Sequence, residues 1–366
     1  MDNDEKDKNT SDIRIRNNID GKDGAGLITR EMYEEAEMKN LSSWATKSAE
    51  SRGRIEQEAP CQLRTAFQRD RDRIIHSKAI RRLMHKTQVF LSPEGDHFRT
   101  RLTHTMDVAQ ISRTIARGLA LNEDLTEAIA LGHDLGHTPF GHAGERVLND
   151  LCSAGFAHYE QSVRVVERLE KDGEGLNLTV EVRDGILNHS TSGNPSTLEG
   201  KIVRLCDKIA YVNSDIDDAI RGKVIKEEDI PREYTEILGN TLRERLNTLI
   251  HDLIRNSMDK NDIIQSDTMR EALTGLRAFM FENVYVNSVA KAEEGKAEYM
   301  IGQLYKYYID HVEKLPEEYG KMLKSGEASV ERVVCDFIAG MTDRYAISVY
   351  KSLFVPTGWQ TDVQRT

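Results

Sequence analysis

The most informative stretch of the sequence is residues 130–145, which read Ala130-Leu-Gly-His133-Asp134-Leu-Gly-His137-Thr-Pro-Phe-Gly-His142-Ala-Gly-Glu145. It places three histidines and two carboxylates in a short helical end followed by a loop broken by glycine and proline. Side chains that titrate or bind metal, gathered where the backbone bends, are typical of a metal-assisted active site. A single histidine is more often structural, but a chance distribution of 11 histidines over 366 residues does not favour such a cluster.

Length and composition restrict the class of protein. A chain of 366 residues with 39% hydrophobic residues can build one large domain or two ordinary ones. The net charge of −11 and the pI near 5.6 do not indicate general affinity for nucleic acid. The sequence shows neither a membrane-helix run nor a signal-peptide layout, and its four widely spaced cysteines fit reduced thiols. We therefore expect a cytoplasmic protein with no membrane partner.

Helical periodicity dominates the chain and predicts an all-α fold. We expect a flexible N-terminal tail at residues 1–26, one domain at 27–355, and a C-terminal tail at 356–366. Within the domain, the metal-binding core is expected at about 98–220 and a helical C-terminal part at about 221–355. One short β-hairpin is predicted over residues 89–102. Predicted helices include one that Asn122 caps and Gly136 ends, and those at 64–88, 144–151, 159–170, 180–189, 198–219, 234–256, 266–290, 297–315, 316–325 and 330–352.

The predicted helix at 64–88 has an apolar side, from Phe67 to Met84, and a basic side. Residues 52–101 carry 12 Lys or Arg against 6 Asp or Glu, a local charge of +6. Such a run is commonly a solvated face with internal ion pairs, and the interleaved Asp70 and Asp72 favour that interpretation. The alternative is a positive surface that meets polyphosphate in the active site or in an oligomer interface. The basic side chains are Arg64, Arg69, Arg71, Arg73, Lys78, Arg81, Arg82 and Lys86.

His133 and Asp134 diverge by about 100° on a helix, so one ion contacts both only at a helix end. Further ligands must come from other elements, and His104 upstream and Asp207 downstream are the candidates. A site of imidazole and carboxylate ligands, with coordination positions left open for water, suits Mn, Fe, Zn, Co or Ni better than a site of oxygen ligands alone would. Mg is less natural with histidine ligands but is not excluded. Such an ion activates water and offsets charge on a phosphoryl oxygen. We therefore expect one divalent metal ion as cofactor.

Longer motifs carry a family resemblance. They are Asp70-Arg-Asp-Arg-Ile-Ile-His-Ser77, Arg99-Thr-Arg-Leu-Thr-His104, residues 132–145, Gly340-Met-Thr-Asp-Arg-Tyr-Ala346, and the H…HD…D signature formed by His104, His133-Asp134 and Asp207. Over roughly residues 28–355 the chain resembles the HD-domain deoxyguanosine triphosphate triphosphohydrolases and their dNTPase-like relatives. The resemblance implies an HD phosphohydrolase fold. It also implies hydrolysis of a dNTP at the α-phosphorus to a deoxynucleoside and inorganic triphosphate.

The resemblance also implies roles for the residues that transfer protons and bind metal. His142 and Glu145 lie three residues apart, on one helix face, and would form a proton-transferring dyad. His137 and His158 match further active-site histidines of the family. The implied metal ligands are His104, His133, Asp134 and Asp207.

On the substrate side, the resemblance implies that Arg101 and Lys208 meet phosphate oxygens. Tyr211 follows Asp207 by one helical turn and would contact phosphate or sugar, leaving no room for a 2′-hydroxyl. Asp215, one turn further, would contact the 3′-hydroxyl. Weaker candidates for triphosphate, sugar and base contacts are Gln88, Arg277 and Tyr285.

Departures from the family pattern concern the base. Phe281 stands where some relatives have His, and Asp107 stands where many have Glu, so dGTP is not assumed as the preferred substrate. As in the family, we expect a homo-oligomer, a tetramer or hexamer, in which a dNTP or GTP effector binds at subunit interfaces and activates the enzyme. The basic side of 64–88 is a candidate effector site. Single-stranded DNA binding, found among relatives, is neither supported nor excluded by the net charge of −11.

Two other functions stay open. One is another HD phosphohydrolase, such as a nucleoside monophosphatase or a cyclic-nucleotide or alarmone hydrolase, against which the pair His142 and Glu145 argues. The other is a non-catalytic nucleotide or nucleic-acid binding scaffold. An intact set of metal ligands argues against the scaffold, because converging ionisable groups cost stability.

Overall fold

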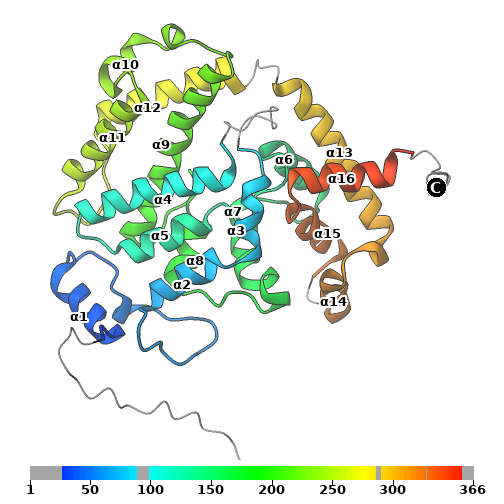
Figure 1. The fold of residues 1–366 in the computed structure, drawn as a ribbon, viewed down its shortest axis with the longest axis horizontal. Helices are drawn as coiled ribbons and strands as arrows, with labels where there is room; N and C mark the ends of the chain where they lie inside the picture. Colours follow the sequence, from blue (N-terminus) through cyan, green and yellow to red (C-terminus); the bar gives the residue numbers. More distant parts are fainter. Residues whose placement is uncertain (1–26, 89–98, 286–289, 327, 357–366) are drawn as a thin grey trace, which may run out of the picture.

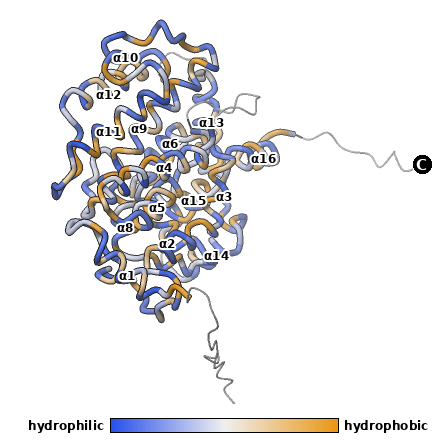
Figure 2. Tube along the Cα trace, turned by 60° about the vertical axis from the view of Figure 1, so that its left-hand side comes forward, coloured by the Kyte–Doolittle hydropathy of each residue, from blue (hydrophilic) through white to orange (hydrophobic). Residues whose placement is uncertain are grey.

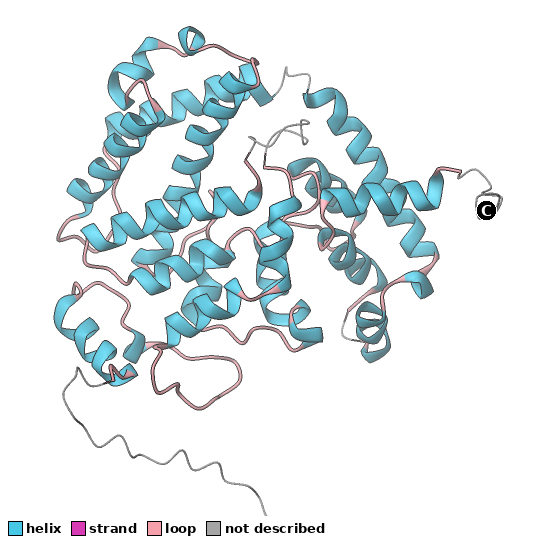
Figure 3. Ribbon diagram, viewed as in Figure 1, coloured by secondary structure: helices cyan, strands magenta, loops and turns pink. Residues whose placement is uncertain are grey.

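The computed structural model describes residues 27–88, 99–285, 290–326 and 328–356. Helices account for 69% of the structure, and the described residues contain no strand (Figures 1 and 3), so the all-α prediction is confirmed. None of the described helices combines the length and apolar character that crossing a lipid bilayer requires. The helices are α1 (Arg30–Asn40), α2 (Ala66–Ile75), α3 (Lys78–Arg82), α4 (Arg101–Gly118), α5 (Glu123–Gly132), α6 (His142–Leu151), α7 (His158–Arg164), α8 (Val180–Leu187), α9 (Leu198–Arg221), α10 (Arg232–Leu238), α11 (Leu242–Ser257), α12 (Asp267–Met280), α13 (Ala290–Asp310), α14 (Glu317–Ser325), α15 (Val330–Ala339) and α16 (Asp343–Phe354).

The first hydrophobic core surrounds α5. This helix packs against α2, α4, α8 and α9, and α4 also packs against α9, which it crosses in the view of Figure 1. Figure 2 shows hydrophobic and hydrophilic residues alternating along the helices, as expected of helices with one buried face. The cap predicted at Asn122 is confirmed, because its side chain accepts a hydrogen bond from the backbone N–H of Leu125 at 3.1 Å. Ile129 of α5 and Ile202 of α9 are fully buried in this core.

The C-terminal end of α5 differs from the prediction. The helix ends at Gly132, four residues before Gly136, so His133 and Asp134 stand in the turn that follows it. Gly136 packs directly on the chain of α7. A Cβ atom there would lie 2.2 Å from the backbone nitrogen of Ser162, which only glycine avoids.

A second hydrophobic core joins α6 to α13, α14, α15 and α16. Leu148 of α6 is fully buried there, together with Ile301 and Ile338. Between the cores lies the buried ammonium group of Lys86, which donates hydrogen bonds to the backbone oxygens of His137 and Ala339. The predicted division of the domain at about residue 220 stays a prediction.

The prediction of one helix over 64–88 is wrong. The chain breaks at Ser77, whose hydroxyl accepts from the backbone N–H of Ile80 and starts α3. The carboxylate of Glu170 accepts hydrogen bonds from the backbone N–H groups of Lys78 and Ala79, at 3.0 and 2.7 Å, and these bonds stabilise the break. The new direction leaves Ile75 and Met84 43% and 51% exposed, although both were assigned to the apolar side.

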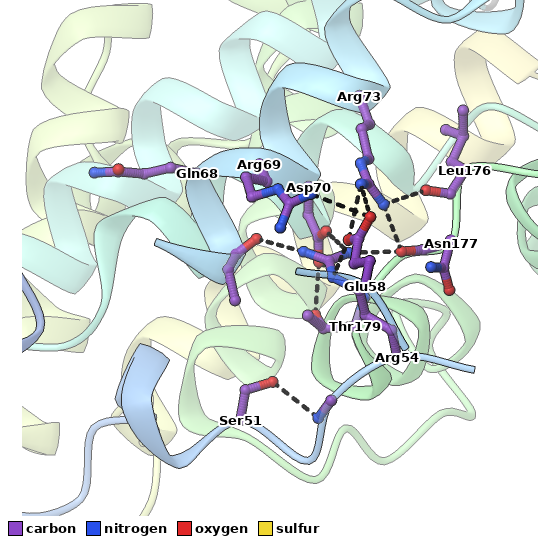
Figure 4. A network of polar contacts seen from close by, with 12 residues as sticks. Ser51, Arg54, Glu58, Gln68, Arg69, Asp70, Arg73, Leu176, Asn177 and Thr179 are labelled. Carbon is purple, nitrogen blue, oxygen red and sulfur yellow. Dashed lines mark hydrogen bonds and ion pairs between the residues drawn. The ribbon is translucent and has the colours of Figure 1, made fainter. Parts of the chain in front are cut away.

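Most of the predicted basic side is paired within the chain. In the network of Figure 4, Arg54 forms a buried ion pair with Asp70, which also accepts two hydrogen bonds from Thr179, at 2.9 and 2.7 Å. Arg73 donates to both carboxylate oxygens of Glu58. The interpretation as an ion-paired face is therefore confirmed for most of these side chains. Further pairs are Arg64–Asp72, Arg69–Glu58, Arg71–Asp124 and Lys78–Asp172.

Other predicted helices are interrupted. The helix predicted at 234–256 splits into α10 and α11, and that at 330–352 splits into α15 and α16, where Thr342 caps α16. The helices predicted at 159–170 and 266–290 each end in a π-helical turn, at Val165–Leu169 and Phe281–Tyr285. Residues 89–98 of the predicted hairpin lie outside the described residues, as do 1–26 and 357–366, most of the two predicted tails. On the hairpin's flanks, Thr87 and Thr100 form a single antiparallel bridge.

Candidate active site

The candidate metal centre begins directly after α5. His133 is fully buried, and its Nδ1 lies 2.6 Å from the backbone oxygen of Ala130. Only a protonated nitrogen donates to a carbonyl group, so Nδ1 carries the proton and Nε2 presents a lone pair. Within the described residues, that Nε2 has no hydrogen-bond partner. It lies 3.5 Å from Oδ1 of Asp134 and 3.8 Å from Oδ1 of Asp207.

Two long helices bring the other candidate ligands to this point. His104, in the first turn of α4, places Nε2 3.0 Å from Oδ1 of Asp207 on α9. Ligand atoms of His104, His133 and Asp134 all lie within 4.8 Å of one another. Burial opposes ionisation of Asp207, but its hydrogen bond with His104 and the charges of His133 and His104 together outweigh burial and lower the pKa of the carboxyl group. The structure thus brings the four predicted ligands together.

A row of histidines continues from the centre. Nε2 of His137 lies 3.3 Å from Oδ1 of Asp134, and the His137 ring stacks on His158 with centroids 4.0 Å apart. The two oxygens of Glu145 contact Nδ1 of His158 at 2.9 Å and Nδ1 of His142 at 3.1 Å. His142 is at the open end, with its side chain 70% exposed, whereas His137 is buried. His142 and Glu145 are therefore hydrogen-bonded to each other, as predicted, and Glu145 is also hydrogen-bonded to His158.

Charge is distributed unevenly along this row. Burial opposes ionisation of Glu145, but hydrogen bonds from His142 and His158 outweigh burial and lower its pKa far below the usual value. Burial also opposes the charge on His158, yet the bond to Glu145 raises the pKa of that imidazole. Burial and the charge of Arg101 hold the pKa of His137 well below its usual value. Near neutral pH, Glu145 is therefore ionised and His137 is neutral.

Arg101 reaches the centre through a contact that the sequence did not predict. Its buried guanidinium donates from Nη1 to Oδ2 of Asp134 at 2.9 Å. The arginine expected at a phosphate thus pairs with a candidate metal ligand. It supplies one fixed positive charge to a carboxylate that is otherwise surrounded by histidines.

One face of α9 carries candidate substrate residues in successive turns. Tyr211 and Asp215 follow Asp207 at four-residue intervals, as predicted from the sequence. The hydroxyl of Tyr285 donates a hydrogen bond to Asp215, and burial raises the pKa of Asp215 to about 7. The guanidinium of Arg277, on α12, lies 5.9 Å from the ring centroid of Tyr211. The structure therefore gathers these four side chains in one cluster beside the candidate metal centre.

Lys208 and Gln88 complete the set of predicted residues. Lys208 is partly buried, and burial together with the charges of Arg204 and Arg277 lowers its pKa. Gln88 lies beside the loop before α6, because its backbone oxygen is 3.6 Å from the position of a Cβ on Gly141. Its side-chain Oε1 is buried and has no partner among the described residues, so a donor from a bound molecule can satisfy it.

Comparison with known proteins gives the family. Residues 101–212 match the HD domain, and residues 263–352 match the phosphohydrolase-associated domain. A protein of Caldanaerobacter subterraneus subsp. tengcongensis named deoxyguanosinetriphosphate triphosphohydrolase-like protein is 61% identical over 333 residues, which cover 91% of this chain and 98% of the relative. This chain belongs to the deoxyguanosinetriphosphate triphosphohydrolase-like family of HD-domain proteins.

Two further members of this family have the same printed name. The proteins of Desulfatibacillum aliphaticivorans and Clostridium perfringens are each 49% identical to this chain, covering 90% and 89% of it and 99% and 98% of themselves. The resemblance drawn from the motifs is therefore confirmed, and the chain is an HD phosphohydrolase. All four candidate metal ligands fall within the matched HD segment.

The residues of this family member fit a divalent metal ion, as HD domains bind. The donors are imidazole nitrogens and carboxylate oxygens, and the free Nε2 of His133 is a buried acceptor that needs a partner. The backbone around it is also fixed. Ser162 Oγ donates to the backbone oxygen of His133 at 2.7 Å and accepts from Gly136 N at 2.9 Å.

The sequence analysis missed His189 and Arg204. His189 follows α8, its Nδ1 lies 2.7 Å from the backbone oxygen of Ile186, and its Nε2 lies 3.3 Å from Nε2 of His158. Like His133, His189 follows the last turn of a buried helix and begins a loop rich in small residues. This similarity to His133 was the sequence signal that could have identified His189 as a candidate site residue. Arg204 precedes Lys208 on α9 by one turn, and an arginine on a helix gives no local sequence signal that separates a ligand-binding side chain from a solvated one.

Proposed function

We propose that this chain hydrolyses deoxynucleoside triphosphates to a deoxynucleoside and inorganic triphosphate, with water attacking the α-phosphorus. The observation that carries the proposal is the convergence of four imidazole and carboxylate ligands beside a hydrogen-bonded histidine–carboxylate pair and a cationic face of α9. The printed names of the relatives support the same reaction class.

The metal-binding part has one task. His104, His133, Asp134 and Asp207 would hold one divalent ion. When bound, the ion would acidify a water molecule and offset the charge of a phosphoryl oxygen. The chain keeps Nε2 of His133 available for this by binding its Nδ1 proton at Ala130.

The histidine–carboxylate part transfers protons. Glu145 stays ionised and orients the exposed His142 through Nδ1, so that Nε2 of His142 faces the open side of the site. As the water oxygen bonds to the α-phosphorus, the bond from the phosphorus to the 5′ oxygen breaks. His142 takes the proton that the attacking water loses and delivers a proton to the leaving oxygen, which completes the deoxynucleoside. Glu145 also holds His158 as a second proton carrier.

The α9 face orients the substrate. Asp215 and Tyr285 would receive the 3′-hydroxyl, and Tyr211 would close the space beside C2′, where a ribonucleotide has a further hydroxyl. Lys208 and Arg277 would meet phosphate oxygens, and Gln88 the base or sugar. The preferred base stays open.

The test is a product analysis. Purified protein is incubated with each dNTP, alone and in pairs, with Mg or Mn, and the products are separated by anion exchange. Deoxynucleoside and inorganic triphosphate should form, and their formation should fall to background in His133→Ala and Asp207→Ala. The matched control is His76→Gln, an exposed histidine remote from the ligand cluster, which should keep full activity. Formation of a monophosphate with pyrophosphate, or of a diphosphate with phosphate, would refute attack at the α-phosphorus.

The paired incubations also address activation. A rate for one dNTP that rises when a second nucleotide is added would support an effector site. Assembly into a tetramer or hexamer stays a prediction, to be measured by light scattering with and without nucleotide.

A further inference from the structure

Three positively charged side chains gather beside the candidate metal centre without a carboxylate partner. They are Arg204 and Lys208, one turn apart on α9, and Arg277 on α12, and in the described part of the chain none of them forms an ion pair. The carboxylate of Asp262 interacts electrostatically with Arg204, but its ion pair is with Lys201, at 2.8 Å. Arg69, Arg71 and Arg73, by contrast, all have carboxylate partners.

One hydrogen bond positions the Arg204 guanidinium, but its other N–H donors have no acceptor in the described residues. Its Nη1 donates to the backbone oxygen of Gly193 at 2.9 Å, while its buried Nε has no acceptor among the described residues. A guanidinium has five N–H donors, so most of its hydrogen-bonding capacity is open to a ligand. Gly193 lies within the loop before α9, and the same loop contains His189, next to His158. Arg204 thus connects this wall of the active site to the cationic face of α9.

Positively charged side chains that lie close together in a partly buried site repel one another, and this repulsion destabilises the folded chain unless an anion is bound. Arg204 and Lys208 lie one turn apart on α9, and the guanidinium of Arg277 lies 5.9 Å from the ring centroid of Tyr211, which follows Lys208 on the same helix. Asp207, next to Lys208 in sequence, is directed to His104 and His133. An anion that touches the metal centre at one end can therefore extend along α9 toward Arg204, which lies about one turn before Asp207, about 4.5 Å along the helix axis and on the side away from Tyr211 and Asp215.

We propose that Arg204 forms, with Lys208 and Arg277, a subsite for the terminal phosphate of a triphosphate chain, and that Arg204 makes the site select triphosphate over shorter phosphate chains. This inference rests on the proposed function, since it assigns the far end of the same substrate. A planar guanidinium can bind a terminal phosphate with two parallel hydrogen bonds, which a shorter chain anchored at the metal centre does not reach.

The test uses the anions alone. Inorganic tripolyphosphate, pyrophosphate and phosphate are titrated calorimetrically into the full chain, with the same excess of magnesium in cell and syringe. In Arg204→Gln the dissociation constant for tripolyphosphate should rise at least tenfold, while those for pyrophosphate and phosphate change less than about twofold. Lys223→Gln is the matched control, because it removes a positive charge from an exposed side chain two residues beyond the C-terminal end of α9. It should leave all three constants unchanged.

Two further measurements keep the outcome decisive. Arg204→Lys retains the charge without the planar fork and should fall between the wild type and Arg204→Gln, and thermal midpoints verify that each variant is folded. An unchanged tripolyphosphate affinity in folded Arg204→Gln, or an equal loss for all three anions, would overturn the assignment. If the wild type hydrolyses no dNTP but Arg204→Gln selectively loses tripolyphosphate, the proposed reaction fails and the subsite stands.

Discussion

The hydroxyl group of Tyr285 donates a hydrogen bond to the carboxyl group of Asp215, which is only 2% exposed. The two residues are 70 positions apart in sequence, and the contact joins the turn after α12 to the substrate face of α9. Because burial raises the pKa of Asp215 to about 7, this carboxyl group changes its charge near neutral pH.

The first prediction is a pH dependence of stability. In the unfolded chain Asp215 has its ordinary pKa of 3.8, whereas in the folded chain its pKa is about 7. Between these two pH values the carboxyl group is protonated in the folded chain and ionised in the unfolded chain. The stabilisation by this group is therefore full below about pH 4 and is lost as the pH rises through 7. From about pH 5 to about pH 8 the wild type should lose on the order of 1–3 kcal/mol more free energy of unfolding than Asp215→Asn, measured by urea denaturation. An identical pH dependence in the two proteins would contradict this.

The second prediction concerns metal content. His133→Gln removes a nitrogen ligand, so bound metal per chain, measured by mass spectrometry after dialysis, should fall at least about tenfold. A ligand that binds only the folded state stabilises it, so a chelator should lower the thermal midpoint of the wild type but hardly that of His133→Gln. His76→Gln should behave as the wild type does. Equal metal content in both variants would exclude His133 as a ligand.

The third prediction concerns Ser162, which touches no candidate ligand atom. Ser162→Ala leaves the N–H of Gly136 and the backbone oxygen of His133 without their partner, which should cost about 1–3 kcal/mol of unfolding free energy. Metal affinity should fall by about 10–100-fold, because the loop that carries His133 is no longer fixed. The exposed Ser192→Ala is the control. Unaltered stability and metal affinity in Ser162→Ala would show that other contacts hold the loop.

The fourth prediction separates proton transfer from metal binding. Glu145→Gln replaces the anion between His142 and His158, so the kcat for dNTP hydrolysis should drop by about 10²–10⁴. Metal content should stay unchanged. Glu160→Gln, an exposed neighbour of His158 on α7, should retain kcat. If Glu145→Gln lowers metal content in parallel with activity, the residue has a structural role instead.

Much of the fold followed from local sequence signals, because apolar spacing reports which residues face a core. The interruptions were harder to place. Ser77 and Thr342 cap new helices in the middle of continuous periodic patterns, and at Ser77 a distant residue also stabilises the break. That residue is Glu170, more than 90 residues away, which no local pattern reveals.

The candidate site was predictable where a motif names the residues and not where tertiary contacts decide. The convergence of His133 with His104 and Asp207 was expected from the family signature. The pairing of Arg101 with Asp134 was not, because an arginine near a phosphate site and an arginine that neutralises a buried carboxylate look alike in sequence. His189 lacked any ligand spacing, and only the packing of α8 brings it to His158.

The helix that carries His142 and Glu145 packs its apolar side on α13, and Arg146 on its outer side pairs with Glu294 and Glu298 at 3.0 and 2.7 Å. These partners lie far beyond residue 212, where the matched HD segment ends. A fragment restricted to that segment would expose Leu148 to water and would leave the helix of His142 and Glu145 without its packing partner. The two matched segments therefore share one hydrophobic core, and recombining either with a foreign partner would require the whole interface of α6 and α13 to be exchanged together.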